Sequence, residues 1–273
     1  MEKISKAQVK RVRSLQQKKF RDELGLFVAE GEKCVEELMK AFELVYRIQS
    51  TDRFTDRVQT GSLIATPTEI EQMSSLRTPQ GVIGVFKKRI QPSEINIQPS
   101  ELVLALDGVQ DPGNLGTIIR TCDWFGVHDI VCSLDTADCY NPKVVQATMG
   151  ALARVRIHYV NLPEWLKGVK SQESRVRIYG TLLEGEDIYK VLSSNCNACS
   201  VDAAGLPNEE KESKDIIIMG NEGNGISPEV RKLITHPIRI PAYPANKKAS
   251  DVVESLNVSI ATAIVLAEFR RAR

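Results

Sequence analysis

Residues 101 to 273 alternate short apolar runs with stripes of apolar residues at helical spacing. The runs predict strands at residues 102–106, 129–132, 154–158, 176–182, 215–219 and 237–240. The stripes predict helices over residues 115–125, from Pro142, from Pro163 and near the C-terminus. Strands that alternate with helices indicate an α/β fold with a mostly parallel sheet covered on both faces. Ligands of such sheets bind beyond the carboxyl ends of the strands.

The first 90 residues predict a smaller α/β unit. Strands are expected at residues 26–29, 44–48 and 82–86, and Val35, Leu38, Met39 and Phe42 recur at the spacing of a buried helix face. Thr66 and Glu69 form the capping-box pattern of a helix start. Residues 87–100 contain two prolines and no periodicity, which is typical of a linker. We therefore expect one domain at residues 1–90 and a second at residues 101–273.

The composition narrows the class of protein. The chain has 273 residues and a formal net charge of +1, so any binding of nucleic acid requires local basic patches. Its apolar runs fall far short of the ~20 residues that cross a bilayer, which predicts no membrane span. The charged N-terminus lacks the apolar segment of a signal peptide, and we expect a cytoplasmic protein.

Cysteine and histidine spacing offers little support for a metal or disulfide framework. The six cysteines are scattered, as expected in a reducing compartment. Cys196 and Cys199 form a CxxC pair, but no second pair follows to complete a zinc site, and the three histidines share no ligand spacing. The sequence predicts no metal.

The clearest electrostatic feature is a run of eight basic side chains within residues 3–21 without one acid among them. Such a run suits contacts with RNA phosphates. The alternative is a solvated helix face with Ile4, Val12 and Leu15 turned inward, and the sequence favours neither. The candidate RNA-binding residues are Lys10, Arg11, Arg13, Lys18, Lys19 and Arg21.

Three segments rich in glycine and polar residues follow predicted strands. In LDGVQDPGNLGTIIRT, Asn114 stands at a helix start, able to cap it or to meet a ligand. Arg120 projects opposite the apolar stripe of that helix, where it is free to meet a partner or is simply a solvated surface arginine. In MGNEGNGISPEV, Glu222 lies between two glycines, whose spacing differs from the GxGxxG of dinucleotide-binding folds. In the third segment, Ser255 and Asn257 precede the C-terminal helix as possible caps.

Taken together, DPGNLGTIIRT, GNEGNGIS and IP followed by ESLNVSIATAI resemble the three ordered motifs of the SpoU class of RNA ribose 2′-O-methyltransferases in the SPOUT superfamily. The resemblance covers residues 101–273. It implies a homodimer that uses S-adenosylmethionine and whose C-terminal part forms a trefoil knot. FVAEGEKCVEELM is similar to the RNA substrate-binding domain that often precedes this catalytic domain and resembles ribosomal proteins.

The resemblance also implies residue roles. The reaction site would comprise Asn114, Arg120, Glu222, Ser255 and Asn257, and the cofactor pocket would comprise Thr181, Gly220, Ile240 and Leu256. An arginine is a poor base because its pKa lies above ~12, so we expect Arg120 to grip phosphate and stabilise developing alkoxide charge, although the family is commonly discussed with this arginine as the base. Glu222 is the alternative proton acceptor. Residues 193–214 and the loop at 242–254 exceed the usual family lengths, and their roles stay unassigned.

Ribosomal RNA is the expected substrate, with transfer RNA as the alternative, because enzymes for both share these motifs. Two other classes remain. A non-catalytic RNA-binding or ribosome-assembly protein would keep the fold but show no turnover. A nucleotide-dependent enzyme of Rossmann type would need a phosphate fingerprint that DGVQDPGNLGT does not match.

Overall fold

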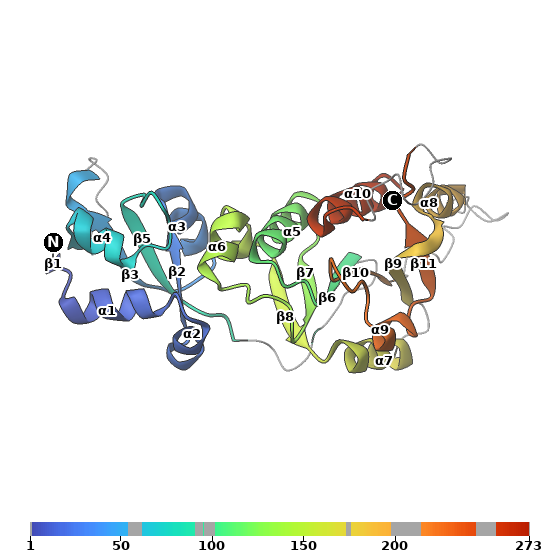
Figure 1. Ribbon diagram of the computed structural model, residues 1–273, viewed down its shortest axis with the longest axis horizontal. Coiled ribbons are helices and arrows are strands. Elements are labelled where there is room, and N and C mark those ends of the chain that lie inside the picture. The colour runs from blue at the N-terminus through green and yellow to red at the C-terminus, as the bar shows by residue number, and fades with distance from the viewer. Residues whose placement is uncertain are drawn as a thin grey trace, which may run out of the picture. The chain divides into compact units, whose positions relative to one another are not determined.

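The structure is a computed structural model that describes residues 2–53, 62–90, 95, 102–172, 176–197, 214–243 and 255–272 (Figure 1). The chain divides into two compact units: the first comprises Met1–Gln91, Leu115–Arg120 and Asp138–Arg154, and the second comprises Pro92–Asn114, Thr121–Ala137 and Val155–Arg273. Most of the expected linker, residues 198–213 and 244–254 of the two long segments, and Cys199 lie outside the described residues, and the side chain of Cys196 is not described.

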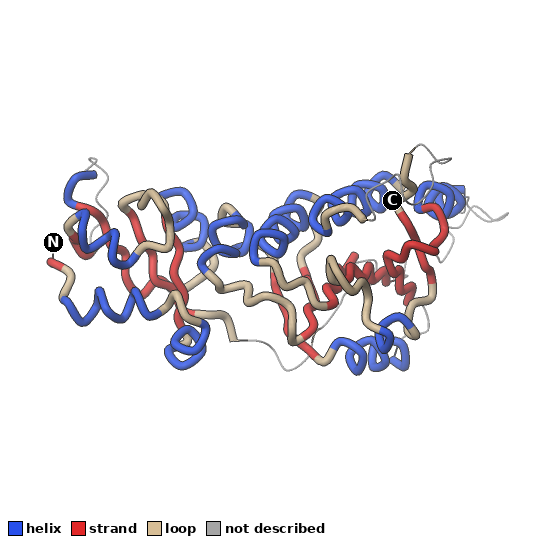
Figure 2. Tube along the Cα trace, viewed as in Figure 1, coloured by secondary structure: helices blue, strands red, loops and turns tan. Residues whose placement is uncertain are grey.

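The first unit contains a five-stranded sheet. Its strands lie in the order β1-β4-β3-β5-β2, with β1 at Glu2–Lys3, β4 at Leu63–Ala65, β3 at Leu44–Ser50, β5 at Val82–Lys87 and β2 at Leu26–Glu30. The helices of this unit are α1 (Lys6–Ser14), α2 (Lys18–Leu24), α3 (Glu32–Met39), α4 (Pro67–Met73) and α6 (Pro142–Thr148), with 3₁₀ turns η1 (Thr51–Arg53) and η2 (Ala151–Ala153). Figure 2 shows this sheet and its helices in contrasting colours.

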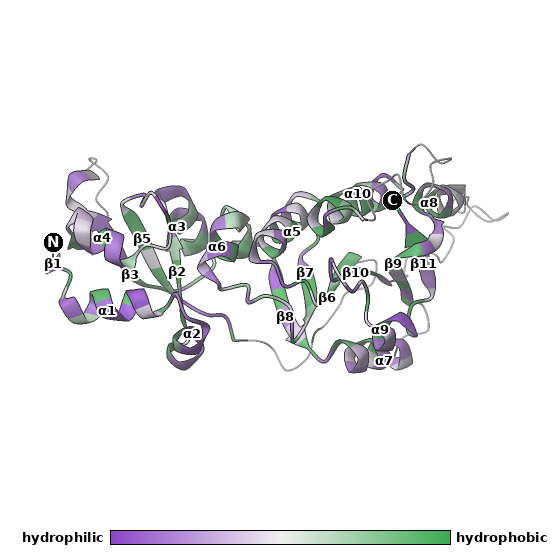
Figure 3. Ribbon diagram, in the orientation of Figure 1, coloured by the Kyte–Doolittle hydropathy of each residue, from purple (hydrophilic) through white to green (hydrophobic). Residues whose placement is uncertain are grey.

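Helices α1 and α4 bury their apolar sides in one core with the first sheet. That core includes Val12 of α1, Leu15 directly after it, Met73 of α4 and Ile48 of β3. Helix α1 carries both polar and apolar positions in Figure 3, as an amphipathic helix on a sheet requires. The expected strands and helices of this unit are found, and β1 and β4 are additional strands too short to leave a periodic pattern.

The second unit contains a six-stranded sheet in which all neighbouring strands are parallel, as predicted. The order is β11-β9-β10-β6-β7-β8, with β11 at His236–Arg239, β9 at Val176–Asp187, β10 at Lys214–Gly220, β6 at Leu102–Asp107, β7 at Asp129–Ser133 and β8 at Arg156–Val160. Helices α7 (Leu162–Gln172) and α9 (Pro228–Arg231) cover one face, and α8 (Ile188–Asn197) and α10 (Val258–Arg271) lie on the other (Figure 1).

Strand alternation sends successive side chains to the two helical layers. Ile178 of β9 belongs to the core under α7 and α9. Its neighbour Tyr179 points the other way and meets Phe269 of α10 edge to face, with ring centroids 4.8 Å apart. Both faces of the sheet are therefore apolar, which explains why its strands read as continuous hydrophobic runs.

Three sequence-based expectations need correction. Helix α5 spans Pro112–Trp124 and its N-cap is Asp111, whose carboxylate accepts from the Asn114 amide at 2.8 Å, so Asn114 does not cap the helix. Helix α8 was not predicted, and it extends to Asn197, over the first residues of the long segment at 193–214. The spacing of Leu256, Ile260, Ile264 and Ala267 predicts one buried side of the C-terminal helix, but α10 buries Val258, Thr262, Val265, Leu266 and Phe269, and Ile260 is 55% exposed.

Candidate active site

The turn after β6 begins with Gly108, whose φ of 73° is a conformation that glycine adopts without strain. Asp111 and Pro112 then start α5: the aspartate caps the helix, and the proline occupies its first turn, where no amide donor is needed. Asn114 follows in that first turn and is partly exposed. The cap frees the Asn114 side chain for contacts outside its own helix.

The turn after β10 is closed by its first residue, Asn221. Its backbone exchanges two hydrogen bonds with Gly225, at 3.0 and 2.9 Å. Its side-chain oxygen accepts from the amides of Gly223 and Asn224, at 2.8 and 3.0 Å. A Cβ on Gly220 would lie 2.4 Å from the Gly225 carbonyl carbon, so only glycine permits this close return of the backbone. Glu222 lies exposed in this turn.

The third segment is fixed by a cap at the start of α10. The side-chain oxygen of Asn257 accepts from the Ser259 amide at 3.0 Å, the Ser259 hydroxyl at 2.6 Å and the Ile260 amide at 3.4 Å. Because this oxygen accepts hydrogen bonds from the first turn of α10, the side-chain nitrogen of Asn257 is the group that can donate to a residue outside the helix.

Side-chain hydrogen bonds join the three segments. The Asn257 Nδ2 donates to Asn114 Oδ1 at 2.9 Å, and Asn114 Nδ2 donates to Glu222 Oε1 at 2.6 Å. Asn114 lies 108 positions before Glu222 and 143 before Asn257, yet the three side chains form one series of hydrogen bonds that ends on a carboxylate. This arrangement fixes the orientation of the Asn114 amide and leaves the second oxygen of Glu222 as an acceptor.

The other predicted reaction-site residues are at the surface. Ser255 is exposed immediately before the Asn257 cap. Arg120 is exposed on α5, while Ile118 and Ile119 beside it are fully buried. The roles of all five residues stay predictions. Asn221 was missed by the sequence analysis, although its position directly after a buried strand was a usable signal.

Among the predicted cofactor residues, Thr181 lies in an irregular stretch of β9. The ladder between β9 and β11 passes from the Gly180–Pro237 pair to the Glu186–Ile238 pair, so residues 181–185 bulge out of it. The Thr181 hydroxyl in this bulge donates to the Ile218 carbonyl at 3.1 Å. Ile240 is half-buried, and Leu256 is 51% exposed. Backbone groups in a bulge and open apolar side chains suit an adenosine, and the nearby Glu222 carboxylate suits a sulfonium, so the residues fit S-adenosylmethionine.

The basic N-terminal segment forms two helices, not one. Helix α1 has no acid in its first turn and presents Lys6, Lys10, Arg11 and Arg13 as exposed side chains. Lys18 and Lys19 of α2 are also exposed, although Lys18 pairs with Asp22 at 3.0 Å. An exposed, basic α1 fits the RNA-phosphate interpretation, which stays a prediction.

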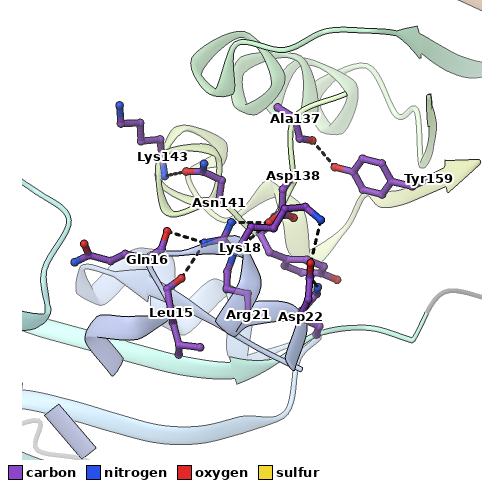
Figure 4. A network of polar contacts seen from close by, with 12 residues as sticks. Leu15, Gln16, Lys18, Arg21, Asp22, Ala137, Asp138, Asn141, Lys143 and Tyr159 are labelled. Carbon is purple, nitrogen blue, oxygen red and sulfur yellow. Dashed lines mark hydrogen bonds and ion pairs between the residues drawn. The ribbon is translucent and has the colours of Figure 1, made fainter. Parts of the chain in front are cut away.

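Arg21 has a different environment from its basic neighbours (Figure 4). It is 2% exposed, and its Nε and Nη2 donate to Asp138 at 3.0 and 2.7 Å. Its Nη1 donates to the carbonyls of Leu15 and Gln16, each at 2.9 Å, and so satisfies the C-terminal end of α1. The expectation that Arg21 contacts RNA therefore conflicts with its burial, because a guanidinium with these bonds has no surface to offer.

The described residues contain neither a metal-binding cluster nor a membrane-spanning helix. No group of three or more His, Cys, Asp or Glu side chains among them could hold a metal ion. No helix in the same part of the chain is long and apolar enough to cross a membrane.

Comparison with known families shows which family the larger, C-terminal part of the chain resembles. Residues 101–267 match the SpoU rRNA Methylase family. The chain belongs to the SpoU rRNA methylase family. Residues 6–84 match the MRM3-like substrate binding domain. The SpoU membership confirms the family and the RNA methyltransferase class that the three ordered motifs predict.

Individual SpoU relatives align along nearly the whole chain. The 23S rRNA (guanosine(2553)-2′-O)-methyltransferase RlmP of Bacillus subtilis is 29% identical over 99% of this chain and 98% of its own length. A solved RNA methyltransferase of the TrmH family from Porphyromonas gingivalis is 36% identical, covers 99% of both chains and gives a TM-score of 0.78. An AdoMet-bound rRNA methyltransferase from Sinorhizobium meliloti is 29% identical, with 99% of this chain and 97% of that one covered and a TM-score of 0.76.

Proposed function

We propose that this chain transfers a methyl group from S-adenosylmethionine to a ribose 2′-hydroxyl of ribosomal RNA. The observation that carries the proposal is the hydrogen-bonded chain from Asn257 through Asn114 to Glu222. It joins all three motifs of a SpoU enzyme at the carboxyl edge of a parallel sheet, where such sheets bind ligands. The names of the B. subtilis and S. meliloti relatives agree with the acceptor and the methyl donor.

S-adenosylmethionine supplies an electrophilic methyl group on a sulfonium. Thr181, Gly220, Ile240 and Leu256 would hold it through backbone groups and apolar contact. The remaining task of the chain is to align the acceptor oxygen and to receive its proton. Glu222 is suited to the second role, because its Oε1 is fixed by Asn114 and its other oxygen can accept the proton from the 2′-hydroxyl.

Arg120 would grip an RNA phosphate and stabilise the negative charge that develops on the acceptor oxygen. Its guanidinium stays protonated at neutral pH and presents several donors in one plane. Its exposure on α5 leaves it accessible to RNA. Ser255 would contact the acceptor nucleotide from the segment that precedes Asn257.

Residues 1–90 would form an RNA substrate-binding domain ahead of a catalytic domain at residues 101–273. Support comes from the substrate-binding match at residues 6–84 and from the exposed basic side chains of α1 and α2. The contacts with phosphate are assigned to Lys10, Arg11, Arg13, Lys18 and Lys19, and Arg21 is left out because it is buried.

The catalytic domain would be a homodimer with a C-terminal trefoil knot, and it would act in the cytoplasm. The 55% exposed Ile260 on α10 supports pairing with a second copy, which sedimentation equilibrium would test. Strand β11 pairs with β9 at one side of the sheet, where a Cβ on Gly185 would lie 2.5 Å from the Ile238 carbonyl carbon. The trefoil knot is proposed from the three SpoU motifs.

The decisive experiment is incubation of the protein with methyl-labelled S-adenosylmethionine and separate pools of unmodified ribosomal and transfer RNA. After digestion to nucleosides, label is expected on a 2′-O-methylated ribose from ribosomal RNA. Label on transfer RNA alone would reassign the substrate. Binding of both cofactor and RNA without label in either pool would favour a non-catalytic RNA-binding protein.

A further inference from the structure

The backbone of Gly108 is hydrogen-bonded through both its N–H and its carbonyl. Its N–H donates to the Ser133 hydroxyl at 2.8 Å, and its carbonyl accepts from Asn221 Nδ2 at 2.7 Å. Ser133 is buried and is itself within 3.0 Å of the Thr136 hydroxyl. The turn after β6, which leads to Asn114, is therefore tied to β7 on one side and to the turn after β10 on the other.

Asn221 uses its side chain in two directions. Its Oδ1 accepts from the amides of Gly223 and Asn224, which organises its own turn, and its Nδ2 reaches outward to Gly108. An asparagine is required for this pair of tasks because it combines an acceptor with a donor. An aspartate would keep the acceptor and lose the donor.

The far end of the same turn has a second tie. The amide of Ser227 donates to the carboxylate of Asp107 at 2.7 Å, and Asp107 is 8% exposed at the end of β6. The Glu222 turn is thus pinned to the end of β6 before and after its tip. Glu222 itself is exposed, so these ties and the Asn114 hydrogen bond are what define its position.

We propose that Asn221 is a positioning residue for methyl transfer: it holds the Glu222 carboxylate against Asn114 by tying the turn after β10 to Gly108. The inference rests on the proposed function of Glu222 and adds the residue that sets its geometry. A turn with three glycines has many conformations, and a displacement of about 1 Å at a reacting group can cost up to a hundredfold in rate. The Asn221 side chain restricts those conformations before substrate binds.

The test is a double-mutant cycle on methyl transfer to ribosomal RNA with Asn221→Ala, Glu222→Gln and the double variant. Asn221→Ala should lower kcat by about tenfold to a hundredfold, with KM for RNA and cofactor affinity changed less than about twofold. If Asn221 acts through Glu222, then Asn221→Ala should add less than about twofold in the Glu222→Gln background. Losses that multiply fully would overturn the proposal.

Two substitutions separate the donated hydrogen bond from general damage to the turn. Asn221→Asp keeps the acceptor for Gly223 and Asn224 but not the donor to Gly108, so it should lower kcat as much as Asn221→Ala does. Asn224→Ala is the matched control three positions along the same turn, and its kcat should equal that of the wild type. Equal losses in Asn221→Ala and Asn224→Ala would contradict a specific role for Asn221.

Amide hydrogen exchange provides a readout that is independent of turnover. Peptides covering residues 108–114 and 220–227 should exchange faster in Asn221→Ala than in Asn224→Ala or the wild type. Ser133→Ala should accelerate exchange of the first peptide, and Ser133→Thr, which keeps the hydroxyl, should restore it. Unchanged exchange in Asn221→Ala would overturn the tie even if the wild type methylates no RNA, so the two failures are distinguishable.

Discussion

The turn network of the second unit and the basic helix of the first unit use polar side chains in opposite ways. Asn114 is hydrogen-bonded to Glu222 at 2.6 Å and to Asn257 at 2.9 Å. Lys10 and Arg13 of α1 extend into solvent. The first arrangement fixes atoms, as a chemical step requires, whereas the second provides charge without a fixed geometry, as RNA backbone binding allows. Substitutions in the two regions should therefore separate turnover from affinity.

The largest effect is expected from Arg120→Ala. Without the guanidinium, neither the phosphate contact nor the stabilisation of the acceptor oxygen remains, and kcat should fall by at least about a hundredfold. Arg120→Lys should recover only a minor part, because an ammonium lacks the planar set of donors. Single-turnover kinetics and calorimetric titration with S-adenosylmethionine would check this.

Cofactor affinity distinguishes the assigned role of Arg120 from a structural one. The exposed side chain stands on a helix whose apolar stripe is fully buried, so removing it should leave folding and cofactor binding unchanged. An equal loss of cofactor affinity and turnover would mean that the role is misassigned.

Asn114→Asp should produce the next largest effect, about a hundredfold in kcat. The variant replaces a donor that lies 2.6 Å from Glu222 with a second carboxylate, and two negative charges at this distance repel. One of the two carboxyl groups would bind a proton, and the acceptor role of Glu222 would be lost. Asn224→Asp adds the same charge in the neighbouring turn and should leave kcat within about twofold.

The sequence predicts which motifs form this site, but it does not predict how hydrogen bonds hold them together. Buried strands and the order of three motifs were sufficient to select Asn114 and Glu222. Asn221 and Asp111 were not selected, because a residue that bonds to backbone groups leaves no signature beyond its position in a turn. Their positions in turns can be read from the sequence, but their partners are carbonyls and amides, which every residue has, so the three-dimensional structure is needed to identify those partners.

In the basic N-terminal segment, the sequence shows where the charges are but not which of them are buried. Counting charges located the cationic helix correctly but could not distinguish exposed lysines from a buried arginine. Arg21 is bonded to Asp138 and to the end of α1, and Asp138 lies more than a hundred residues away along the chain. Burial depends on such distant partners, and no local pattern contains them.

Charge removal on α1 should change affinity and leave the chemical step alone. The double variant Lys10→Ala, Arg13→Ala should weaken RNA binding about tenfold. It should also reduce the slope of log affinity against log salt by about 1.5, because fewer counterions are released on binding when two phosphate contacts are missing. Its kcat at saturating RNA should equal that of the wild type. Fluorescence titrations at several salt concentrations would measure both quantities.

Arg21→Met is the matched control for this double variant, because it removes a positive charge from the same segment but from a buried position. It should lower the melting temperature and leave the salt slope unchanged in the folded protein. A salt slope altered equally by both variants would show that the exposed side chains do not act as phosphate contacts.

The smallest combined effect on RNA affinity and turnover is expected from Asp129→Asn at the amino end of β7, opposite the carboxyl ends of the strands. Asp129 begins β7 and accepts hydrogen bonds from His158 at 2.8 Å and from Arg156. Burial alone would raise the pKa of this carboxyl group, but the bonds from His158 and Arg156 lower it below the ordinary 3.8. A group whose pKa is lowered by folding stabilises the protein above its unfolded-state pKa, and that contribution is lost as the pH falls through the lower folded-state value.

The wild type should therefore lose stability as the pH decreases below about 4, and Asp129→Asn should show less of this dependence while melting at a lower temperature at pH 7. Its kcat at a permissive temperature should stay within about twofold of the wild type, because the carboxyl edge with Asn114 and Glu222 is not touched. Thermal melts from pH 3 to 7 would measure the stability term. A large loss of kcat in the folded Asp129→Asn protein would mean that the amino and carboxyl ends of the strands are coupled. The geometry of the site would then depend on the whole sheet and not only on the hydrogen bonds within the site.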